Sequence, residues 1–95
     1  MLAVQTAFVL IGANPDRIAA LATELAAVDG VAEAYSVAGE ADLVAVVRVR
    51  HMDELADVVT SRIGALPGIV HTRTMVAFKA YSQADVAAMW DLGTD

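Results

Sequence analysis

The sequence predicts an α+β fold in which two βαβ halves share one antiparallel four-stranded sheet, with both helices on the same face. Runs rich in β-branched residues alternate with segments whose apolar residues recur every three or four positions, as in strands and amphipathic helices. The 95 residues have room for one domain, and no low-complexity linker interrupts them. A shift of 38 residues superposes Leu21 on Val59, Leu25 on Ile63, Val28 on Leu66, Gly30 on Gly68 and Val31 on Ile69. The closed arrangement of two such halves is the ferredoxin-like fold.

The first half begins with a strand expected over residues 3–11, which are rich in β-branched and aromatic side chains and end at Gly12. Asn14 and Pro15 predict the start of a helix, because an Asn side chain caps free N–H groups and proline fits the first helical position. The helix has one apolar stripe, made of Ile18, Leu21, Ala22, Leu25 and Val28. The Asp-Gly pair at 29–30 is expected to end it.

The first half closes with a strand expected over residues 31–38, and the second half opens with a strand expected over residues 43–50. The four residues 39–42 between them contain a glycine and indicate a tight hairpin. A second helix fits residues 52–63. Its expected inner face consists of Met52, Leu55, Val59 and Ile63.

A fourth strand is expected over residues 69–79, after the Leu-Pro-Gly turn at 66–68. Ser82, with Asp85 three residues later, indicates an approximate capping box for a short last helix. That helix would carry Val86, Met89 and Trp90, for which packing is a simpler role than ligand binding.

The composition excludes several classes of protein. Net charge is −6, with six basic and twelve acidic residues, so direct binding of nucleic acid by this chain is not expected. Cysteine is absent, which removes thiolate metal sites and cysteine nucleophiles. The longest apolar run, residues 7–13, is far shorter than the roughly 18 residues that a membrane helix needs. The start of the sequence lacks a basic secretory region, so a cytoplasmic location is expected.

Apolar residues nevertheless make up 58% of the chain, above the roughly 45–50% of average soluble domains. In the third strand one face should carry Leu43, Ala45, Val47 and Val49, and the other face should carry Val44 and Val46. In the fourth strand one face should carry Ile69 and Met75, and the other face should carry Val70, Val76 and Phe78. Because two helices cover only one face of a sheet, the other apolar face needs a cover of its own. We therefore expect an obligate homodimer that pairs sheet to sheet.

Catalytic signatures are absent from the sequence. His51 and His71 could share a metal ion with Asp53 or Glu54, but no metal-binding pattern such as His-Glu-x-x-His supports such a site. Solvent-facing histidines at strand ends are the simpler interpretation. We expect no catalytic residue, no metal and no cofactor.

The hairpin at 39–42 is the most promising binding feature. A tight turn exposes backbone N–H groups that can meet an α-carboxylate, and Asp42 at its exit can receive an α-amino group. Most turns of this kind connect two strands and bind no ligand. Thr72 and Thr74, on one face of the fourth strand, could supply hydroxyl groups or simply favour the strand.

Residues 37–44 (Val-Ala-Gly-Glu-Ala-Asp-Leu-Val) and 66–74 (Leu-Pro-Gly-Ile-Val-His-Thr-Arg-Thr) together resemble the effector-binding domain of the Lrp/AsnC family, the feast/famine regulators. The resemblance covers nearly the whole chain. It implies a ferredoxin-like module that dimerises sheet to sheet and assembles into higher oligomers. It also implies an amino-acid-like effector, bound in clefts where dimers meet.

The resemblance also suggests which residues contact the effector. They are Gly39, Ala41, Asp42, Thr72, Thr74, Met75 and Val76. Ala41 replaces a residue that is often aromatic in the family, which leaves the identity of the ligand open. The family's N-terminal helix-turn-helix is not found before the first strand, so the chain resembles the stand-alone members.

The resulting hypothesis is a single ligand-binding domain over residues 1–95 that is not an enzyme. It would regulate transcription through its oligomeric assembly, one route being co-assembly with a DNA-binding member of the family. A rival hypothesis is a small dimeric α/β-barrel enzyme of the monooxygenase or isomerase type. That enzyme would need an internal cavity, with Tyr35, Tyr81 and Trp90 as candidate site residues. A third is an assembly protein that binds no ligand.

Overall fold

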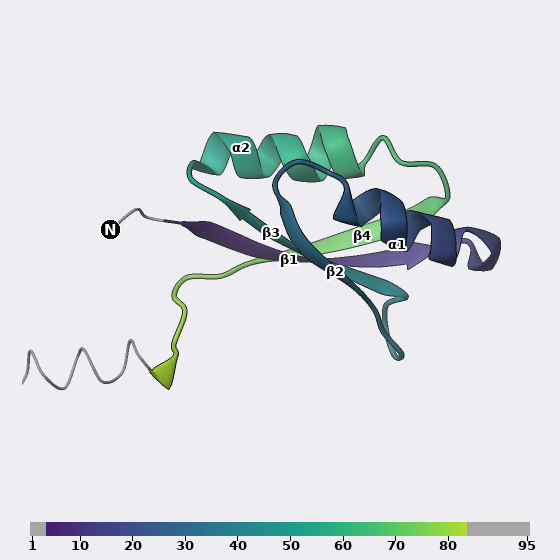
Figure 1. Cartoon of the computed structure of the whole chain (residues 1–95), viewed down its shortest axis with the longest axis horizontal. Coiled ribbons are helices and arrows are strands. Elements are labelled where there is room, and N and C mark those ends of the chain that lie inside the picture. Colours follow the sequence, from purple (N-terminus) through teal and green to yellow (C-terminus); the bar gives the residue numbers. More distant parts are fainter. Residues whose placement is uncertain (1–3, 84–95) are drawn as a thin grey trace, which may run out of the picture.

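One antiparallel sheet of four strands carries both helices on the same face (Figure 1). The computed structural model describes residues 4–83. Its elements are, in chain order, the strand β1 (Gln5–Ala13), the 3₁₀ turn η1 (Pro15–Arg17), the helix α1 (Ile18–Ala26), the strands β2 (Val31–Ser36) and β3 (Leu43–Val49), the helix α2 (Met52–Asp57), its π-helical continuation η2 (Val58–Ile63) and the strand β4 (Ile69–Val76). The strand order is β2-β3-β1-β4. The predicted ferredoxin-like α+β fold is thereby confirmed.

The hydrophobic core lies between the sheet and the two helices. Alternate residues of β1, namely Ala7, Val9 and Ile11, are fully buried on that side. The helix α1 contributes Leu21 and Leu25, as its predicted apolar stripe requires. Burying a leucine side chain of this kind stabilises the fold by about 1.5–3 kcal/mol.

The strand β1 lies in the middle of the sheet. It pairs with β3 along Gln5–Ile11 and with β4 along Ala7–Ala13. The prediction that Gly12 ends this strand is wrong, because Gly12 pairs with His71 of β4 and the pairing continues to Ala13. Gly12 fits there because it lacks a side chain: a Cβ atom would lie 2.2 Å from Cε1 of His71.

The first helix begins at a proline, as predicted, but without the expected side-chain cap. Pro15 opens the short turn η1, and the backbone carbonyl of Asn14 accepts the N–H of Arg17 at 2.9 Å. The Asn14 side chain makes no capping hydrogen bond. The N–H of Asn14 instead donates to the carbonyl of Gly68 at 2.9 Å, which ties the start of the helix to the turn before β4.

The second helix spans residues 52–63 as predicted, but its inner face differs. Leu55, Val58 and Ile63 are buried, whereas Met52 is 53% exposed and Val59 only partly buried. From Val58 onwards the helix is the π-helical segment η2, in which the N–H of Gly64 bonds to the carbonyl five residues earlier. The wider turn accounts for the spacing of five residues between the buried Val58 and Ile63.

The two remaining strands are shorter than expected. The strand β2 ends at Ser36, so the connection to β3 comprises the six residues 37–42 rather than four. The strand β4 ends at Val76, and the last hydrogen bond on this edge runs from the N–H of Ala77 to the carbonyl of Thr6 at 2.9 Å. The expected last helix, with Asp85, Val86, Met89 and Trp90, lies outside the described residues.

A register shift in β4 overturns one prediction about its faces. The pairing with β1 slips between Gly12 and Ala13, so that Ile69 packs against the core while Met75 lies on the opposite face. The expectation that Ile69 and Met75 share a face is therefore wrong. A bulge of this kind reverses the alternation of side chains, and the residue pattern of the strand does not predict it.

Candidate functional site

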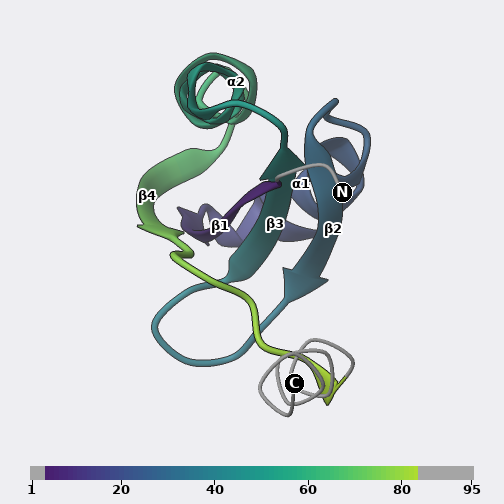
Figure 2. The ribbon, with the colours of Figure 1, turned by 90° about the vertical axis from the view of Figure 1, so that its left-hand side faces the viewer.

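The loop 37–42 is held at the end of the sheet by three hydrogen bonds. The N–H of Val37 donates to the carbonyl of Asp42 at 3.0 Å, and the N–H of Asp42 donates to the carbonyl of Ile11 at 2.9 Å. The Oδ2 atom of Asp42 accepts the N–H of Ala13 at 2.9 Å. The loop curves from β2 below the end of the sheet and back to β3 (Figure 2).

These bonds fix the orientation of the Asp42 carboxylate. Asp42 is half-buried and tied to the central strand, and Ala41 beside it is buried. Gly39 lies on the open part of the loop with φ of +124°, and no atom would be within 4 Å of a Cβ added there. The loop thus presents an oriented carboxylate next to exposed, unobstructed backbone.

The predicted site residues of β4 fall on two sides of the sheet. Thr72 and Thr74 pair with Ile11 and Val9, so they share the helix side with Val76, whereas Met75 pairs with Phe8 and lies on the open side. Thr74 and Val76 line an apolar groove of about 240 Å³ beside the second helix. One copy of the chain therefore does not bring all seven predicted residues into one pocket.

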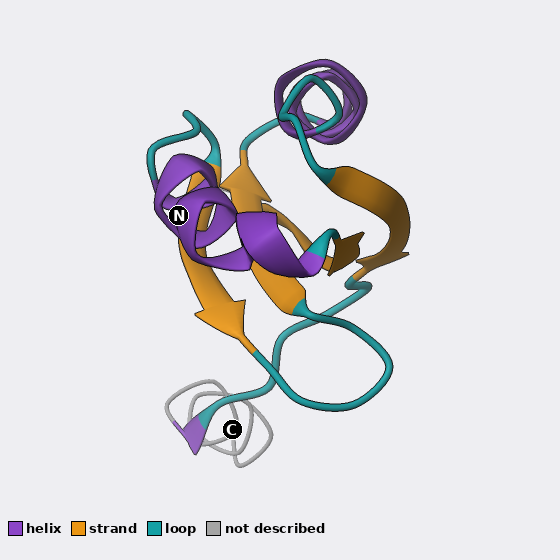
Figure 3. Ribbon diagram, turned by 90° about the vertical axis from the view of Figure 1, so that its right-hand side faces the viewer, coloured by secondary structure: helices purple, strands orange, loops and turns teal. Residues whose placement is uncertain are grey.

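Arg73, to which the sequence alone assigned no role, lies next to the loop. Its Nη1 atom lies 4.0 Å from Oε2 of Glu40, and both side chains are mostly exposed, at 72% and 87%. The loop extends towards β4 when seen from either end (Figures 2 and 3). The alternation of Thr-Arg-Thr predicts that Arg73 lies on the face opposite to its two neighbours, but it does not predict that Arg73 lies near the loop.

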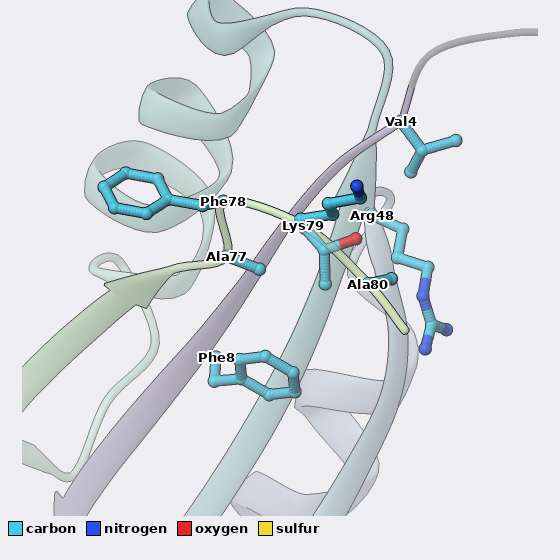
Figure 4. A pocket seen from close by; sticks show the side chains of 8 residues that line it. Val4, Phe8, Arg48, Ala77, Phe78, Lys79 and Ala80 are labelled. Carbon is cyan, nitrogen blue, oxygen red and sulfur yellow. The ribbon is translucent and has the colours of Figure 1, made fainter. Parts of the chain in front are cut away.

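The sheet face opposite to α1 and α2 has an apolar centre and polar edges. Phe8, Leu10, Val44, Val46 and Met75 share this open face, and Val46 at its centre is only 5% exposed. A hollow of about 230 Å³ lies at one end, below residues 77–80, and Figure 4 shows Phe8 and Arg48 at its wall. An apolar centre with a polar rim is the usual composition of a protein interface.

Glu33, Tyr35 and Arg48 form the polar edge of this open face. The Tyr35 hydroxyl donates to the Glu33 carboxylate, and Nη1 of Arg48 lies 3.2 Å from Oε1 of Glu33. The hydrogen bond from Tyr35 is the main cause that lowers the pKa of Glu33, and Arg48 adds to it. The same hydrogen bond raises the pKa of Tyr35, because the phenol must lose its proton beside a carboxylate.

Within the part of the chain that the structure describes, the side chains expected of an enzyme or a metal site are not brought together. Tyr35 lies on the open face, Tyr81 is under the ammonium group of Lys79, and Trp90 lies outside the described residues. His51 is exposed before α2, and His71 covers Gly12. Within residues 4–83 no group of three or more potential metal-binding side chains is found.

No helix among residues 4–83 is long and apolar enough to cross a membrane.

Comparison with known proteins gives consistent matches. Residues 6–87 match the model of the Lrp/AsnC ligand binding domain. The uncharacterised HTH-type transcriptional regulator PH1916 of Pyrococcus horikoshii is 37% identical over 76 residues, which are 77% of this chain and 51% of that protein. The chain thus spans about half the length of the curated relatives it matches.

Solved structures extend the comparison to the fold. The structure of TTHA0845 from Thermus thermophilus superposes with a TM-score of 0.78 and 48% identity, covering 83% of this chain and 99% of that one. AsnC of E. coli superposes with a TM-score of 0.77 and 22% identity, covering 83% of this chain and 54% of that one. The second likeness shows the shared fold.

Proposed function

This chain belongs to the family of Lrp/AsnC ligand binding domains, and on that basis we propose that it is a regulatory module that binds an amino acid or a related small metabolite. Its curated relatives are HTH-type transcriptional regulators, of which it spans about half. We propose that residues 1–95 form one such domain, which acts in the cytoplasm on transcription and is not an enzyme.

The observation that carries this proposal is the oriented carboxylate of Asp42. One of its oxygen atoms is held by the N–H of Ala13, so the side chain cannot swing away from the end of the sheet. The other oxygen can receive the ammonium group of an effector. The backbone at Gly39 is exposed, with nothing within 4 Å of a Cβ placed there, and its N–H groups could bind the α-carboxylate.

The open face of the sheet supports assembly through a second copy. Phe8 is 38% exposed and Met75 51% exposed, and they lie next to each other on this face. Burying about 600 Å² of apolar surface on each chain would contribute about 15 kcal/mol per chain before the costs of association. A two-fold dimer, sheet against sheet, covers both apolar faces at once.

Higher assembly would complete the binding site. Met75 and the pair Thr72 and Thr74 point to opposite sides of one sheet, so a single effector can reach them only if different copies contribute them. We propose a cleft between dimers, with Asp42 and Gly39 from one copy. Co-assembly with a DNA-binding member of the family would pass the signal to DNA.

Effector binding changes assembly only if the effector binds two oligomeric states with different affinity. A coupling of about 1–3 kcal/mol is typical. A saturating effector would thus change the equilibrium constant between the two oligomeric states by about 5-fold to 150-fold.

The proposal is tested by isothermal titration calorimetry with the twenty amino acids, followed by sedimentation velocity with and without the tightest binder. At least one amino acid should bind and change the oligomer distribution. Asp42→Asn should weaken binding about tenfold or more, since it removes the charge that holds the ammonium group. Asp53→Asn, which changes an exposed carboxylate in α2, is the matched control. Absence of binding by all twenty, or equal effects of the two variants, would contradict the proposal.

A further inference from the structure

We propose that Arg73 is the residue that recognises the α-carboxylate of the effector, and that it exchanges Glu40 for that carboxylate when the effector binds. This inference rests on the proposed function and deepens it, because it makes the site selective for zwitterionic amino acids over amines. The observation behind it is the pair formed by Arg73 of β4 and Glu40 of the loop, at 4.0 Å.

The charge of the loop favours a nearby cation. Glu40 and Asp42 place two carboxylates within three residues of one loop, and the chain carries a net charge of −6. Such a loop attracts an ammonium group but repels an α-carboxylate. Backbone N–H groups at Gly39 offer partial charges only, so a guanidinium beside them would hold the α-carboxylate of a zwitterion more strongly.

Among the described residues, Arg73 is the cation placed to fill this role. Arg17 lies at the same end of the sheet, but it is held by Glu24 at 2.5 Å and by the carbonyl of Pro67 at 3.2 Å. The remaining basic residues lie at or beside the end of the sheet that is far from the loop 37–42. They are Arg48, Arg50, Arg62 and Lys79. Arg73 has Glu40 as its ion-pair partner, and its own side chain is 72% exposed.

The pair with Glu40 is weak enough to be exchanged. The separation of 4.0 Å and the exposure of both groups place it among surface ion pairs, which contribute little to stability. A ligand carboxylate can form two parallel hydrogen bonds with a guanidinium, a geometry that is stronger than a single loose contact. Glu40 therefore acts as an internal competitor, which keeps Arg73 near the loop until an amino acid arrives.

The experiment compares the tightest-binding amino acid of the calorimetric panel with its carboxamide, which keeps the ammonium group and the side chain but has no negative charge. For the unaltered chain, the amino acid should bind at least tenfold more tightly than the carboxamide. Arg73→Gln should weaken binding of the amino acid by about tenfold to a hundredfold and leave the carboxamide within about twofold, which removes the discrimination.

Three further variants sharpen the test. Arg73→Lys should lose part of the discrimination, because lysine keeps the charge but not the two-pronged geometry. Glu40→Gln should tighten binding of the amino acid by a few fold, since the competitor is gone. Arg50→Gln removes the same charge at the far end of the sheet and should change neither affinity. Circular dichroism confirms that each variant is folded.

The outcomes separate this inference from the proposed function. If an amino acid binds and depends on Asp42, but Arg73→Gln weakens the amino acid and the carboxamide equally or affects neither, the role of Arg73 is overturned and the proposed function stands. If no amino acid binds the unaltered chain, the proposed function fails and this inference fails with it. If Arg73→Gln alone abolishes the preference for the carboxylate, the inference holds.

Discussion

The side chain of Asp42 accepts a hydrogen bond of 2.9 Å from the backbone N–H of Ala13, 29 residues away in the sequence. The bond forms just before Leu43, the first residue of β3, where β1 continues beyond its pairing with β3, so the carboxylate takes the place of a missing strand partner. The same residue gives its N–H to the carbonyl of Ile11. Asp42 therefore caps this end of the sheet, and it is also the proposed binding site for the ammonium group.

Replacing Asp42 should reduce stability by an amount that depends on the replacement. Asp42→Ala leaves the half-buried N–H of Ala13 without its acceptor, and we expect a loss of about 1–3 kcal/mol in the free energy of unfolding. Asp42→Asn keeps an acceptor oxygen, so its loss should be smaller. Urea denaturation followed by circular dichroism measures both. Equal losses for the two variants would show that the hydrogen bond to Ala13 is not the cause.

Two glycines with positive φ should respond differently to alanine. At Gly30, with φ of +101°, a Cβ would lie 2.6 Å from Cγ2 of the fully buried Val58, so backbone strain and a core clash add. At Gly39, with φ of +124°, a Cβ would meet open space, and backbone strain acts alone.

Thermal unfolding should therefore show a loss of about 1–2 kcal/mol for Gly39→Ala and a loss at least about 1 kcal/mol larger for Gly30→Ala. A Gly39→Ala variant as unstable as Gly30→Ala would mean that loop packing, and not φ alone, constrains Gly39.

A charge in the centre of the open face should prevent the proposed dimer. Phe8→Glu buries an unpaired carboxylate in the two-fold contact, and we expect the dimer dissociation constant to rise by at least about a hundredfold. Sedimentation equilibrium measures this constant. Met52→Glu makes the same kind of change at an exposed position on the helix side, and it should leave the dimer intact. A dimer that tolerates Phe8→Glu would place the contact elsewhere.

The hydrogen bond between Tyr35 and Glu33 should be visible in titrations. Tyr35→Phe should raise the pKa of Glu33 towards its ordinary value of 4.5, because the bond that favours the carboxylate is lost. Arg48→Gln should also raise it, because Arg48 lowers the pKa of Glu33 both through a hydrogen bond and through its charge. Carbon-detected NMR of the Glu33 carboxyl group measures both shifts. An unchanged pKa of Glu33 in Tyr35→Phe would show that the hydrogen bond from Tyr35 does not favour the carboxylate.

The direction of the pH effect on stability follows from these shifts. The lowered pKa of Glu33 gives a contribution that is present above pH 4.5 and lost as the pH falls through the folded-state pKa. The raised pKa of Tyr35 gives a contribution that is present below pH 10.0 and lost as the pH rises through the folded-state value. Tyr35→Phe should weaken both contributions.

Most of the fold could be predicted because the chain repeats one pattern twice. The spacing of Leu21 and Leu25 identifies the buried side of α1, and the alternation in β3 identifies its core face, since both depend on local periodicity. The misplaced inner face of the second helix has a different origin. Val58 lies three residues after the buried Leu55, which is ordinary helical spacing, but the five-residue step from Val58 to Ile63 follows the π turn of η2, which the residue spacing did not predict.

The candidate site was less predictable than the fold. Asp42 could be selected from its place at the exit of a glycine-containing turn, but its bond to Ala13 depends on strand pairing across 29 residues. Arg73 was overlooked because its nearness to Glu40 arises only when β4 pairs with β1. Long-range pairing of this kind leaves no trace in local residue spacing.

The central position of β1 has a consequence for synthesis of the protein. Ribosomes make β1 before every other strand, yet one of its two neighbours, β4, ends only at Val76. Until that last strand has emerged, the nascent chain holds a strand of β-branched and aromatic residues with one edge unsatisfied. The first strand of this sheet to be translated therefore gains its second neighbouring strand last. During that interval chaperones can shield its unpaired edge.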